Sequence, residues 1–402
     1  MLQAVCDERR VSHTIRPMQL QLPQPCADAL AASVALEHLI ARDIERHDGW
    51  ISFARYMELA LYAPELGYYS GGAAKLGKDG DFTTAPEISP LFGATLARLA
   101  QELFAQSDAA IMEFGAGTGK LALDILHELR AAGQLPHTYY IVEISAQLRA
   151  RQQQTLREFP QVRWLDSLPA SFSGVVIGNE VLDAMPVQLV VRTEDGWAER
   201  GVALTPQGQF CFADQTCSAA LLAHIDAQIP DADSLPVTYL TEVHAIASGF
   251  MQSLAAMLSK QKSAVLLFDY GFPAHEYYFP GRTQGTLMCH YRHHAHGDPF
   301  YLPGLQDITA HVDFTAMARS AIEAGLGVCG YSSQAGFLLN AGIGTLLLRT
   351  SPEQAADYLP QANAVQKLIS PAEMGELFKV LALGNDIDWP QHLLAHDRTH
   401  RL

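Results

Sequence analysis

Residues 111–126, IMEFGAGTGKLALDIL, place three alternate glycines and a lysine between an apolar run and an amphipathic segment. The apolar run is typical of a buried β-strand, and the segment after Lys120 has the periodicity of a helix. Glycines in the connecting loop let the backbone turn sharply and approach a ligand closely. The stretch therefore predicts a strand, a ligand-binding loop and a helix.

The spacing of these glycines separates several kinds of nucleotide site. A phosphate-binding P-loop requires four residues between its glycines and a Ser or Thr after its lysine. Here three residues lie between Gly115 and Gly119, and Leu121 follows Lys120. A dinucleotide loop of the form GxGxxG would require a glycine in place of Lys120. The spacing excludes the P-loop and makes a nicotinamide or flavin site a weaker alternative, which stays open.

The remaining pattern is a GxGxG loop preceded by an acidic residue, formed by Glu113, Gly115, Gly117 and Gly119. Because this loop lacks the features that hold a pyrophosphate, it suits a ligand that joins an amino-acid tail to a nucleoside. S-adenosyl-L-methionine has this composition, and we expect the four residues to bind it.

Two further acids end the next two expected strands. Glu143 is placed to accept hydrogen bonds from both ribose hydroxyls of the donor, and Asp166 to receive the amino group of adenine. The alternative for both is N-capping of the following helix, a role that Ser145 and Ser167 could also fill. In order on three successive strands, the loop and the two acids predict S-adenosyl-L-methionine as the cofactor.

Strands and helices alternate through the middle of the chain. AAIMEF, TYYIVEI, VRWL and GVVIGNE are apolar, β-rich runs, and SAVLLFDYGF at 263–272 resumes this pattern. Between them, VQLVVRTEDGWAERGVAL is typical of a hairpin that turns at Asp195 and Gly196. Such alternation predicts βαβ units and a parallel sheet. We expect an α/β, Rossmann-like fold with a mostly parallel, doubly wound sheet, an N-terminal helical region and a β-rich insertion.

Composition and charge exclude several classes of protein. A net charge of −16 opposes binding to nucleic acid, whose backbone requires a concentrated basic surface, and is compatible with a cationic substrate. No segment approaches the ~20 apolar residues that span a bilayer, so no membrane insertion is expected. Six cysteines without a CxxC pair indicate a reducing compartment. We expect a cytoplasmic protein in a bacterium, or a mitochondrial matrix protein in a eukaryote.

Several motifs together resemble the MidA-like family of class I methyltransferases, the group that includes the mitochondrial complex I assembly methyltransferase. GDFTTxPE followed by NEVLDAxP is much more specific than a GxGxG loop alone. The resemblance implies methyl transfer from S-adenosyl-L-methionine to an arginine of a respiratory complex I subunit, or of another protein in a bacterial relative. The motifs are GYYS at 67–70, GDFTTAPEISPLFG at 80–93, EFGAGTGKLALDIL at 113–126, GNEVLDAMPV at 178–187, FDYGF at 268–272 and GTLMCHYRHHAHGDPFYLPGLQDITAHVDF at 285–314.

Three polar residues just past the fourth expected strand are the predicted catalytic residues. At this edge of an open α/β sheet, Asn179, Glu180 and Asp183 should lie beside the ligand. A guanidinium stays protonated, with a pKa above ~12, so carboxylates are suited to hold it and aim one nitrogen. We expect Glu180 to orient the guanidinium, Asp183 to assist or hold the insertion, and Asn179 to contact the donor or the acceptor. Alternatively, Asp183 only caps a turn that Pro186 ends.

Other residues are expected around the same pocket. Thr84 and Glu87 have the spacing of a capping box that opens a helix to about residue 105. The family resemblance favours them as a wall of the donor pocket, where the helix N-terminus could face the donor's carboxylate. A buried tyrosine with a core partner is an open alternative on the acceptor side. The predicted acceptor-side residues are Asp269, Tyr270, His311 and Asp313.

The segment CHYRHHAHGD at 289–298 gathers histidines beside a cysteine, a composition that suggests zinc. In a single strand, His290, His294 and His296 would share one face while His293 opposes them. Because methyl transfer from a sulfonium needs no metal, a polar loop near the acceptor channel is the preferred interpretation. No metal is predicted.

The motifs divide the chain into parts. Helical spacing with a break at Gly49 marks residues 31–62, and two late helices are expected around 361–383. The predicted parts are a flexible arm at 1–30, a helical region at 31–105 that closes the donor pocket, a methyltransferase core at 106–350 with its insertion at about 186–260, and a helical tail at 351–402.

Three functions stay open at this point. The preferred one is a protein arginine methyltransferase whose partner is a protein with an exposed arginine. The second is a non-catalytic assembly factor that binds S-adenosyl-L-methionine, which would not require the acidic pair formed by Glu180 and Asp183. A methyltransferase for another amine is the third, although the long insertion favours a large acceptor. Whether the protein forms a homodimer is left open.

Overall fold

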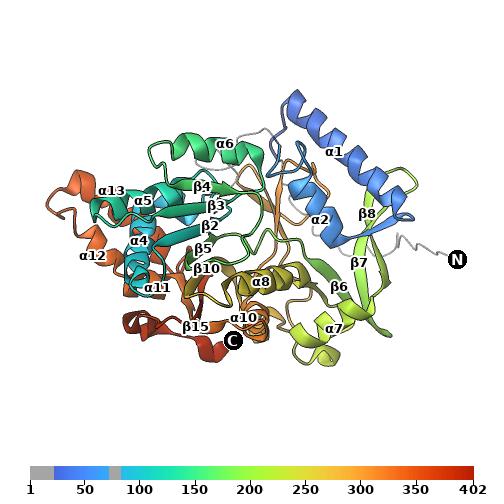
Figure 1. Ribbon diagram of the computed structural model, residues 1–402. Coiled ribbons are helices and arrows are strands. Elements are labelled where there is room, and N and C mark those ends of the chain that lie inside the picture. Colours follow the sequence, from blue (N-terminus) through green and yellow to red (C-terminus); the bar gives the residue numbers. More distant parts are fainter. Residues whose placement is uncertain (1–21, 72–82) are drawn as a thin grey trace.

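The computed structural model describes residues 22–71 and 83–402 of the chain. At its centre lies an eight-stranded sheet in the order β15-β16-β10-β5-β2-β3-β4, with β14 beside the end of β10 (Figure 1). The five strands from β4 to β10 are parallel, whereas β16 runs antiparallel to both of its neighbours. The strands are β2 (Ala110–Phe114), β3 (Thr138–Val142), β4 (Val162–Leu165), β5 (Gly174–Asn179), β10 (Ser263–Phe272), β14 (Val312–Asp313), β15 (Gly327–Ser333) and β16 (Phe378–Asn385).

The order of the strands reverses at β2. Strands β3 and β4 lie on one side of it, and β5 and β10 lie on the other. Such a doubly wound sheet binds ligands beyond the carboxyl ends of its strands, where the order reverses. The predicted α/β, Rossmann-like fold with a mostly parallel sheet is confirmed.

Helices cover both faces of this sheet because its strands send alternate side chains into two apolar cores. Ile111 and Ile177 belong to a core with α4 and α5, and Met112 and Val176 to a core with α8 and α10. Strand β2 is buried along its whole length, as expected for a central parallel strand. The helices are α3 (Ala85–Ile88), α4 (Pro90–Phe104), α5 (Lys120–Ala131), α6 (Ala146–Thr155), α8 (Ala245–Leu258), α9 (Ala274–Tyr277), α10 (Phe314–Glu323), α11 (Gln334–Asn340), α12 (Ile343–Leu347) and α13 (Ala355–Ile369).

A second sheet combines the N-terminal region with the insertion. Strand β1 pairs with β7, and a Cβ on Gly201 of β7 would lie 2.2 Å from the Ile51 carbonyl oxygen and 2.4 Å from the Trp50 ring. This close pairing therefore requires glycine at position 201. The elements of this half are α1 (Ala27–Arg46), β1 (Trp50–Ser52), α2 (Phe53–Tyr62), β6 (Gln188–Thr193), β7 (Gly196–Leu204), β8 (Phe210–Thr216), α7 (Ala219–Gln228), η1 (Ala232–Ser234) and β9 (Leu240–Val243).

The hairpin predicted inside the insertion is confirmed, since Asp195 and Gly196 lie where β6 turns into β7. The insertion was expected at about 186–260. Its strands end at Val243, and α8, which follows them, packs against α10 in the core of the main sheet.

The N-terminal region holds two helices, as its spacing predicted, but a strand lies between them. Strand β1 has three residues, too few for a periodic pattern to show. Helix α1 begins at Ala27, within the expected arm of 1–30, and residues 1–21 of that arm lie outside the described residues.

The histidine-rich segment forms a hairpin rather than a single strand. Strand β11 (Met288–Tyr291) pairs with β12 (His294–His296) and with β13 (Asp307–Thr309). The turn consists of Arg292 and His293, both with positive φ (47° and 65°). Within 22–71 and 83–402, no group of three or more His, Cys, Asp or Glu is arranged to hold a metal ion. The absence of a metal stays a prediction.

The C-terminal segment adds a strand to the main sheet. Helix α13 lies in the predicted helical tail of 351–402. The prediction of a second late helix is wrong, because Phe378–Asn385 forms β16 between β10 and β15. Every residue of β16 except the last is buried. The sequence FKVLALGN therefore has neither an alternating pattern nor a polar face from which its structure could be predicted. Two short helices follow, η2 (Gln391–His396) and η3 (Thr399–Arg401).

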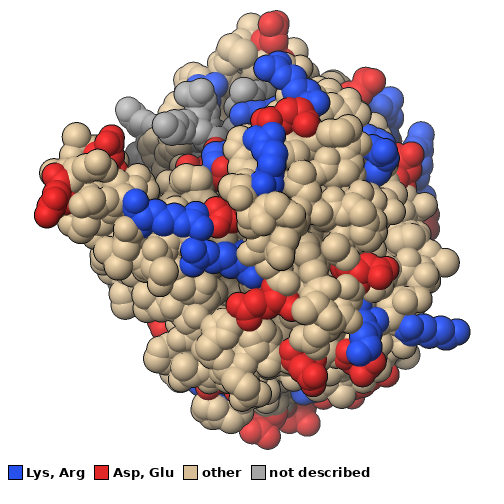
Figure 2. Space-filling view, turned by 60° about the vertical axis from the view of Figure 1, so that its left-hand side comes forward, with Lys and Arg blue, Asp and Glu red and all other residues tan. Residues whose placement is uncertain are grey.

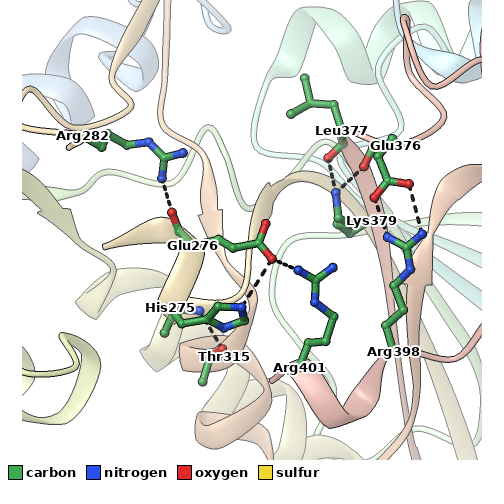
Figure 3. Close-up of polar contacts among 10 residues, drawn as sticks. His275, Glu276, Arg282, Thr315, Glu376, Leu377, Lys379, Arg398 and Arg401 are labelled. Carbon is green, nitrogen blue, oxygen red and sulfur yellow. Dashed lines mark hydrogen bonds and ion pairs between the residues drawn. The ribbon is translucent and has the colours of Figure 1, made fainter. Parts of the chain in front are cut away.

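Ion pairs fasten the C-terminal residues to the edge of the main sheet (Figure 3). The guanidinium of Arg401 contacts the carboxylate of Glu276 in α9, and that of Arg398 contacts Glu376 just before β16. The ammonium of Lys379 donates to main-chain carbonyls of the same turn. Each cation of this cluster is therefore matched to a carboxylate or to carbonyl oxygens.

Charged side chains of both signs are interspersed over the face shown in Figure 2. Pairs such as Arg349 with Glu128 and Arg130 with Glu158 show the same local matching. As far as the chain is described, none of its helices reaches the length and apolarity that a membrane span requires.

Candidate functional site

A cavity of about 520 Å³ lies at the carboxyl ends of β2, β3 and β5. The glycine loop after β2 forms one wall, Tyr62 and Tyr69 of the N-terminal region form another, and Ile246 and Phe250 of α8 form a third. Small-molecule sites typically have volumes of roughly 300–1,000 Å³. The cavity also lies where the strand order reverses, which is the expected ligand position in this fold.

The glycine loop has a backbone that only glycine adopts without strain. Gly115, Gly117 and Gly119 have positive φ angles of 61°, 53° and 82°. The first two line the cavity. Gly119 lies behind it, where an added Cβ would be 3.4 Å from Gln152 and Thr155. Two of the predicted glycines can therefore contact a ligand, and the third allows close packing against α6.

Glu113 ends β2, lines the cavity and is 2% exposed. The hydroxyl of Tyr139 donates to its carboxylate at 2.6 Å. Burial raises the pKa of Glu113 to about 7; the Tyr139 hydrogen bond opposes this shift and the Glu143 carboxylate adds to it. A cationic group in the cavity would stabilise the ionised form of Glu113.

Glu143 directly follows β3 and lines the cavity, as Glu113 does. Its carboxylate accepts hydrogen bonds from the N–H of Ser145 and the amide of Gln152, both at 2.8 Å. Gln152 also donates to the carbonyl of Gly117 at 3.0 Å, which joins the acid to the glycine loop. Ser145, and not Glu143, caps α6. The carboxylate of Glu143 is thus fixed at the cavity wall without serving as the helix cap.

The structure does not bring Asp166 to the cavity. Its side chain is 84% exposed and pairs with the guanidinium of Arg149. The next two residues, Ser167 and Leu168, line the cavity instead. The end of the third strand therefore reaches the expected place, but the acid points away from it.

Thr84 and Glu87 both line the cavity, but they form no capping box. The Thr84 side chain makes no capping hydrogen bond, and the expected helix is divided at Ser89, which caps α4. Glu87 instead accepts a hydrogen bond from the hydroxyl of Thr118 in the glycine loop. This contact joins the N-terminal region to the loop.

The three predicted catalytic residues lie together on the cavity wall after β5. Asn179 donates to Glu180 at 3.0 Å, and Glu180 has a positive φ of 55°, a strained conformation for a residue with a side chain. Buried polar atoms normally have partners, yet Asn179 Oδ1 and Asp183 Oδ1 have none in the part of the chain that the structure describes. The wall therefore presents acceptor atoms that a ligand with N–H groups would satisfy.

The pKa values of the acidic pair on this wall, Glu180 and Asp183, are both raised. Burial, followed by the carboxylate of Asp183, raises the pKa of Glu180 to about 8. Burial also raises the pKa of Asp183 to about 6, against a hydrogen bond from Tyr270. None of the described residues supplies a cation among the causes of these shifts. Strongly raised pKa values of acids in a cavity are typical of functional sites.

The four predicted acceptor-side residues lie behind the cavity wall rather than on it. Asp269 is fully buried, and Tyr270 donates to Asp183 at 2.6 Å. The ring of His311 contacts Tyr270, and Asp313 caps α10. The structure therefore connects Asp269 and Tyr270 to the acidic pair, whereas the other two have core roles.

Sequence reasoning missed several residues of the cavity. Tyr62 and Tyr69 stack on each other at 5.5 Å, and Tyr62 donates to the carbonyl of Ala184 just after the acidic pair. Of these two tyrosines, only Tyr69 lies in a recognised motif, GYYS at 67–70. Gln152 does not line the cavity but supports Glu143, and it lies on a polar helix with no pattern that marks it.

Comparison with protein families agrees with this site. Residues 91–332 match the model of a family described as S-adenosyl-L-methionine-dependent methyltransferases. The matched range includes the glycine loop, Glu143 and the acidic pair.

Named relatives cover most of the chain. Protein arginine methyltransferase NDUFAF7, mitochondrial, from Danio rerio is 29% identical and aligns over 92% of this chain and 92% of its own. The protein of the same name from Bos taurus is 30% identical over 91% of this chain and 85% of its own.

A crystal structure from Burkholderia thailandensis is similar over nearly the whole chain. It is 51% identical, has a TM-score of 0.89, and covers 95% of this chain and 100% of its own. That protein is bound to S-adenosyl-homocysteine.

Proposed function

This chain belongs to the family of S-adenosyl-L-methionine-dependent methyltransferases, and from that premise we propose that it transfers methyl groups to an arginine side chain of a partner protein. The observation that carries the proposal is the acidic pair Glu180 and Asp183. It lies on the wall of the cavity that the glycine loop also lines. Because no described residue brings a cation to it, this acidic pair suits a guanidinium far better than a neutral acceptor.

The donor side of the cavity fits S-adenosyl-L-methionine. We assign Gly115 and Gly117 to close contact with its amino-acid part, and Glu113 to the neighbouring ammonium. Glu143 is held in place to accept the ribose hydroxyls. Apolar side chains beyond Glu143 suit the adenine ring, and Ser167 takes the place that was expected for Asp166. The apolar residues are Ile144, Leu148 and Leu168.

The acceptor side must orient a poor nucleophile. When bound, S-adenosyl-L-methionine supplies an activated methyl group and leaves as S-adenosyl-homocysteine, so the protein mainly positions the attacking nitrogen. The methylated nitrogen gives up one N–H proton, which Glu180 or Asp183 accepts. Glu180 and Asp183 accept N–H bonds from the guanidinium, and the free oxygen of Asn179 accepts from either ligand. Because a guanidinium fixes the ionised form of both acids, binding relieves the cost of their burial.

The partner and the location follow from the relatives and the family resemblance. The relatives are named mitochondrial protein arginine methyltransferases, and the resemblance includes the complex I assembly methyltransferase. We therefore propose a respiratory complex I subunit as the acceptor. The protein would act in the cytoplasm of a bacterium or in the mitochondrial matrix of a eukaryote.

Label transfer to a complex I-enriched extract tests this function. The protein is incubated with methyl-labelled donor, and the labelled residue is identified by mass spectrometry. Glu180→Gln should retain calorimetric binding of S-adenosyl-homocysteine but lose transfer roughly 100-fold, since charge-assisted bonds are worth about 1.5–3 kcal/mol each. Glu199→Gln is the matched control, because Glu199 is a partly buried acid with a raised pKa outside the cavity. Label on another residue type, or full activity of Glu180→Gln, contradicts the proposal.

A further inference from the structure

The turn that carries the acidic pair is held from behind by one buried carboxylate. Asp269 of β10 is 0% exposed. Its Oδ2 accepts the backbone N–H of Leu182 at 2.9 Å and of Asp183 at 3.2 Å, and its Oδ1 accepts the N–H of Tyr270 at 2.9 Å. The two donors from the turn fix its path relative to the sheet, and the Tyr270 N–H holds the carboxylate in place on β10.

The next residue of β10 holds the acid itself. The Tyr270 hydroxyl donates to Oδ2 of Asp183 at 2.6 Å, while Oδ1 of the same carboxylate has no hydrogen-bond partner among residues 22–71 and 83–402. The Tyr270 ring is held between His311 and Phe378, at centroid distances of 5.0 and 5.4 Å. One oxygen of Asp183 is thereby occupied, and the other is left for a ligand.

We propose that Asp269 and Tyr270 are positioning residues for the acceptor, which orient Asp183 so that its free oxygen receives one N–H of the guanidinium. The inference rests on the proposed function. It separates the roles of neighbouring residues: Glu180 and Asp183 touch the acceptor, whereas Asp269 and Tyr270 act only through Asp183. Neither positioning residue lines the cavity, so donor binding does not depend on them directly.

The Tyr270 hydroxyl also affects the charge of Asp183. A hydrogen bond to a carboxylate favours its ionised form, and this bond lowers the pKa of Asp183 against the effect of burial. Removing the hydroxyl should therefore raise that pKa. On acidification, the variant should lose activity at a higher pH than the wild type does. The titratable groups that face Asp183 are Glu180 in its own turn, Asp269 and Tyr270 on β10, Tyr62 and Tyr69 of the N-terminal region, and Asp307 behind Tyr69.

A second tyrosine–carboxylate bond provides a matched control. The Tyr277 hydroxyl donates to Glu242 at 2.8 Å; both side chains are fully buried, and neither lines the cavity. Tyr277→Phe removes a bond of the same type and burial. A merely structural role of Tyr270 would make the two substitutions equivalent.

The test measures methyl transfer to the acceptor that the wild-type protein labels, as a function of pH, for Tyr270→Phe and Tyr277→Phe. We expect Tyr270→Phe to lower kcat roughly tenfold, to leave S-adenosyl-homocysteine binding unchanged, and to move the acid limb of the pH profile up by about one unit. Tyr277→Phe should keep kcat and the pH profile, whatever its melting temperature. An unshifted acid limb, or equal effects of the two substitutions, overturns the inference.

Asp269 is tested separately because its loss could prevent folding. Asp269→Asn keeps the size of the side chain but turns one acceptor into an N–H₂ group. We expect it to fold, to bind S-adenosyl-homocysteine, and to lose kcat by more than Tyr270→Phe. A folded Asp269→Asn protein with wild-type kcat contradicts the positioning role. If the wild type labels a residue other than arginine, the proposed function fails, while the pH shift of Tyr270→Phe still decides the positioning role.

Discussion

Two clusters of buried or half-buried acids in this protein are built in opposite ways. At the C-terminal edge of the sheet, Glu276 pairs with Arg401 and Glu376 pairs with Arg398 (Figure 3). On the cavity wall, Glu180 faces other acids, and the described residues bring no cation to it. The first cluster contains its own counter-ions, whereas the second receives none from residues 22–71 and 83–402.

The pKa shifts of the two clusters differ in sign. Although burial raises the pKa of Glu376, the hydrogen bond and charge of Arg398 give a net lowering. Burial and Asp183 raise the pKa of Glu180 to about 8. Lowered values are expected where charges stabilise the fold, and raised values where a ligand must supply the missing charge. Under the proposed function, this difference in sign separates acids that stabilise the fold from acids that bind the ligand.

Glu180→Gln is expected to have the largest effect on stability and activity, and it tests whether the two clusters differ. Ionised Glu180 is disfavoured in the folded protein, so its replacement by a neutral amide should raise the melting temperature while methylation falls roughly 100-fold. Differential scanning calorimetry at pH 8 measures the first effect, and label transfer measures the second. Glu376→Gln should show the reverse pattern, with lower stability and retained transfer. A less stable Glu180→Gln protein would remove the basis for distinguishing the two clusters.

Glu143 is an intermediate case, because neutral donors rather than a cation hold it. Gln152→Leu removes its amide donor and the link to the Gly117 carbonyl. We expect affinity for S-adenosyl-homocysteine to fall roughly tenfold in calorimetry, since the ribose-binding carboxylate loses its orientation. Gln228→Leu, which removes a buried amide away from the cavity, is the control. Unchanged affinity of Gln152→Leu would show that Glu143 does not depend on this support.

The sequence predicted the residues that line the cavity better at the glycine loop and Glu143 than at the end of β10. The glycine loop and Glu143 could be found because strand ends and loop spacing determine their place in a parallel sheet. Asp166 also follows a strand, but side-chain direction after a strand end has no sequence signal, and it points to Arg149. For the same reason, Asp269 and Tyr270 were placed at the correct edge of the sheet but expected in contact with the acceptor.

The fold was predictable where its patterns are long and periodic. Alternating strands and helices indicated the parallel sheet, whereas β16 was expected as a helix because it is apolar and buried on both faces. The pairing of β1 with β7 joins residues 50–52 to 201–203. Such distant pairing depends on tertiary packing and leaves no local pattern. The N-terminal wall of the cavity could therefore not be derived from spacing.

Because no described residue supplies a counter-ion to Glu180, binding of a cationic acceptor should release protons. With its pKa raised to about 8, Glu180 holds a proton at pH 7, and a bound guanidinium should displace it. Binding of an arginine acceptor peptide should release up to about one proton, which appears as a difference in calorimetric enthalpy between buffers of unequal ionisation enthalpy. The release should vanish in Glu180→Gln. Equal enthalpies in both buffers for the wild type would mean that Glu180 is already ionised.

The same raised pKa determines how stability depends on pH. Between the ordinary value of 4.5 and about 8, folded Glu180 binds more protons than unfolded Glu180, so its contribution to the free energy of unfolding falls as pH rises. The lowered pKa of Glu376 acts in the opposite direction, since its stabilisation is present at neutral pH and is lost as pH falls. The gain in the free energy of unfolding of Glu180→Gln over wild type should therefore be largest at alkaline pH. The loss in the free energy of unfolding of Glu376→Gln should be smallest at acid pH.

The smallest expected effect lies in the completed cluster. Arg398→Gln breaks the pair with Glu376, whose side chains are 29% and 47% exposed, so solvent already screens much of their attraction. The melting temperature should fall by about 1 °C or less, because such pairs contribute about 0.2–1 kcal/mol and a chain of this length has a large unfolding entropy. Methyl transfer should stay at the wild-type rate, since the cavity acids do not use this cation. A loss of transfer in Arg398→Gln without loss of donor binding would mean that the C-terminal cluster takes part in holding the acceptor, and the division between the two clusters would then have to be abandoned.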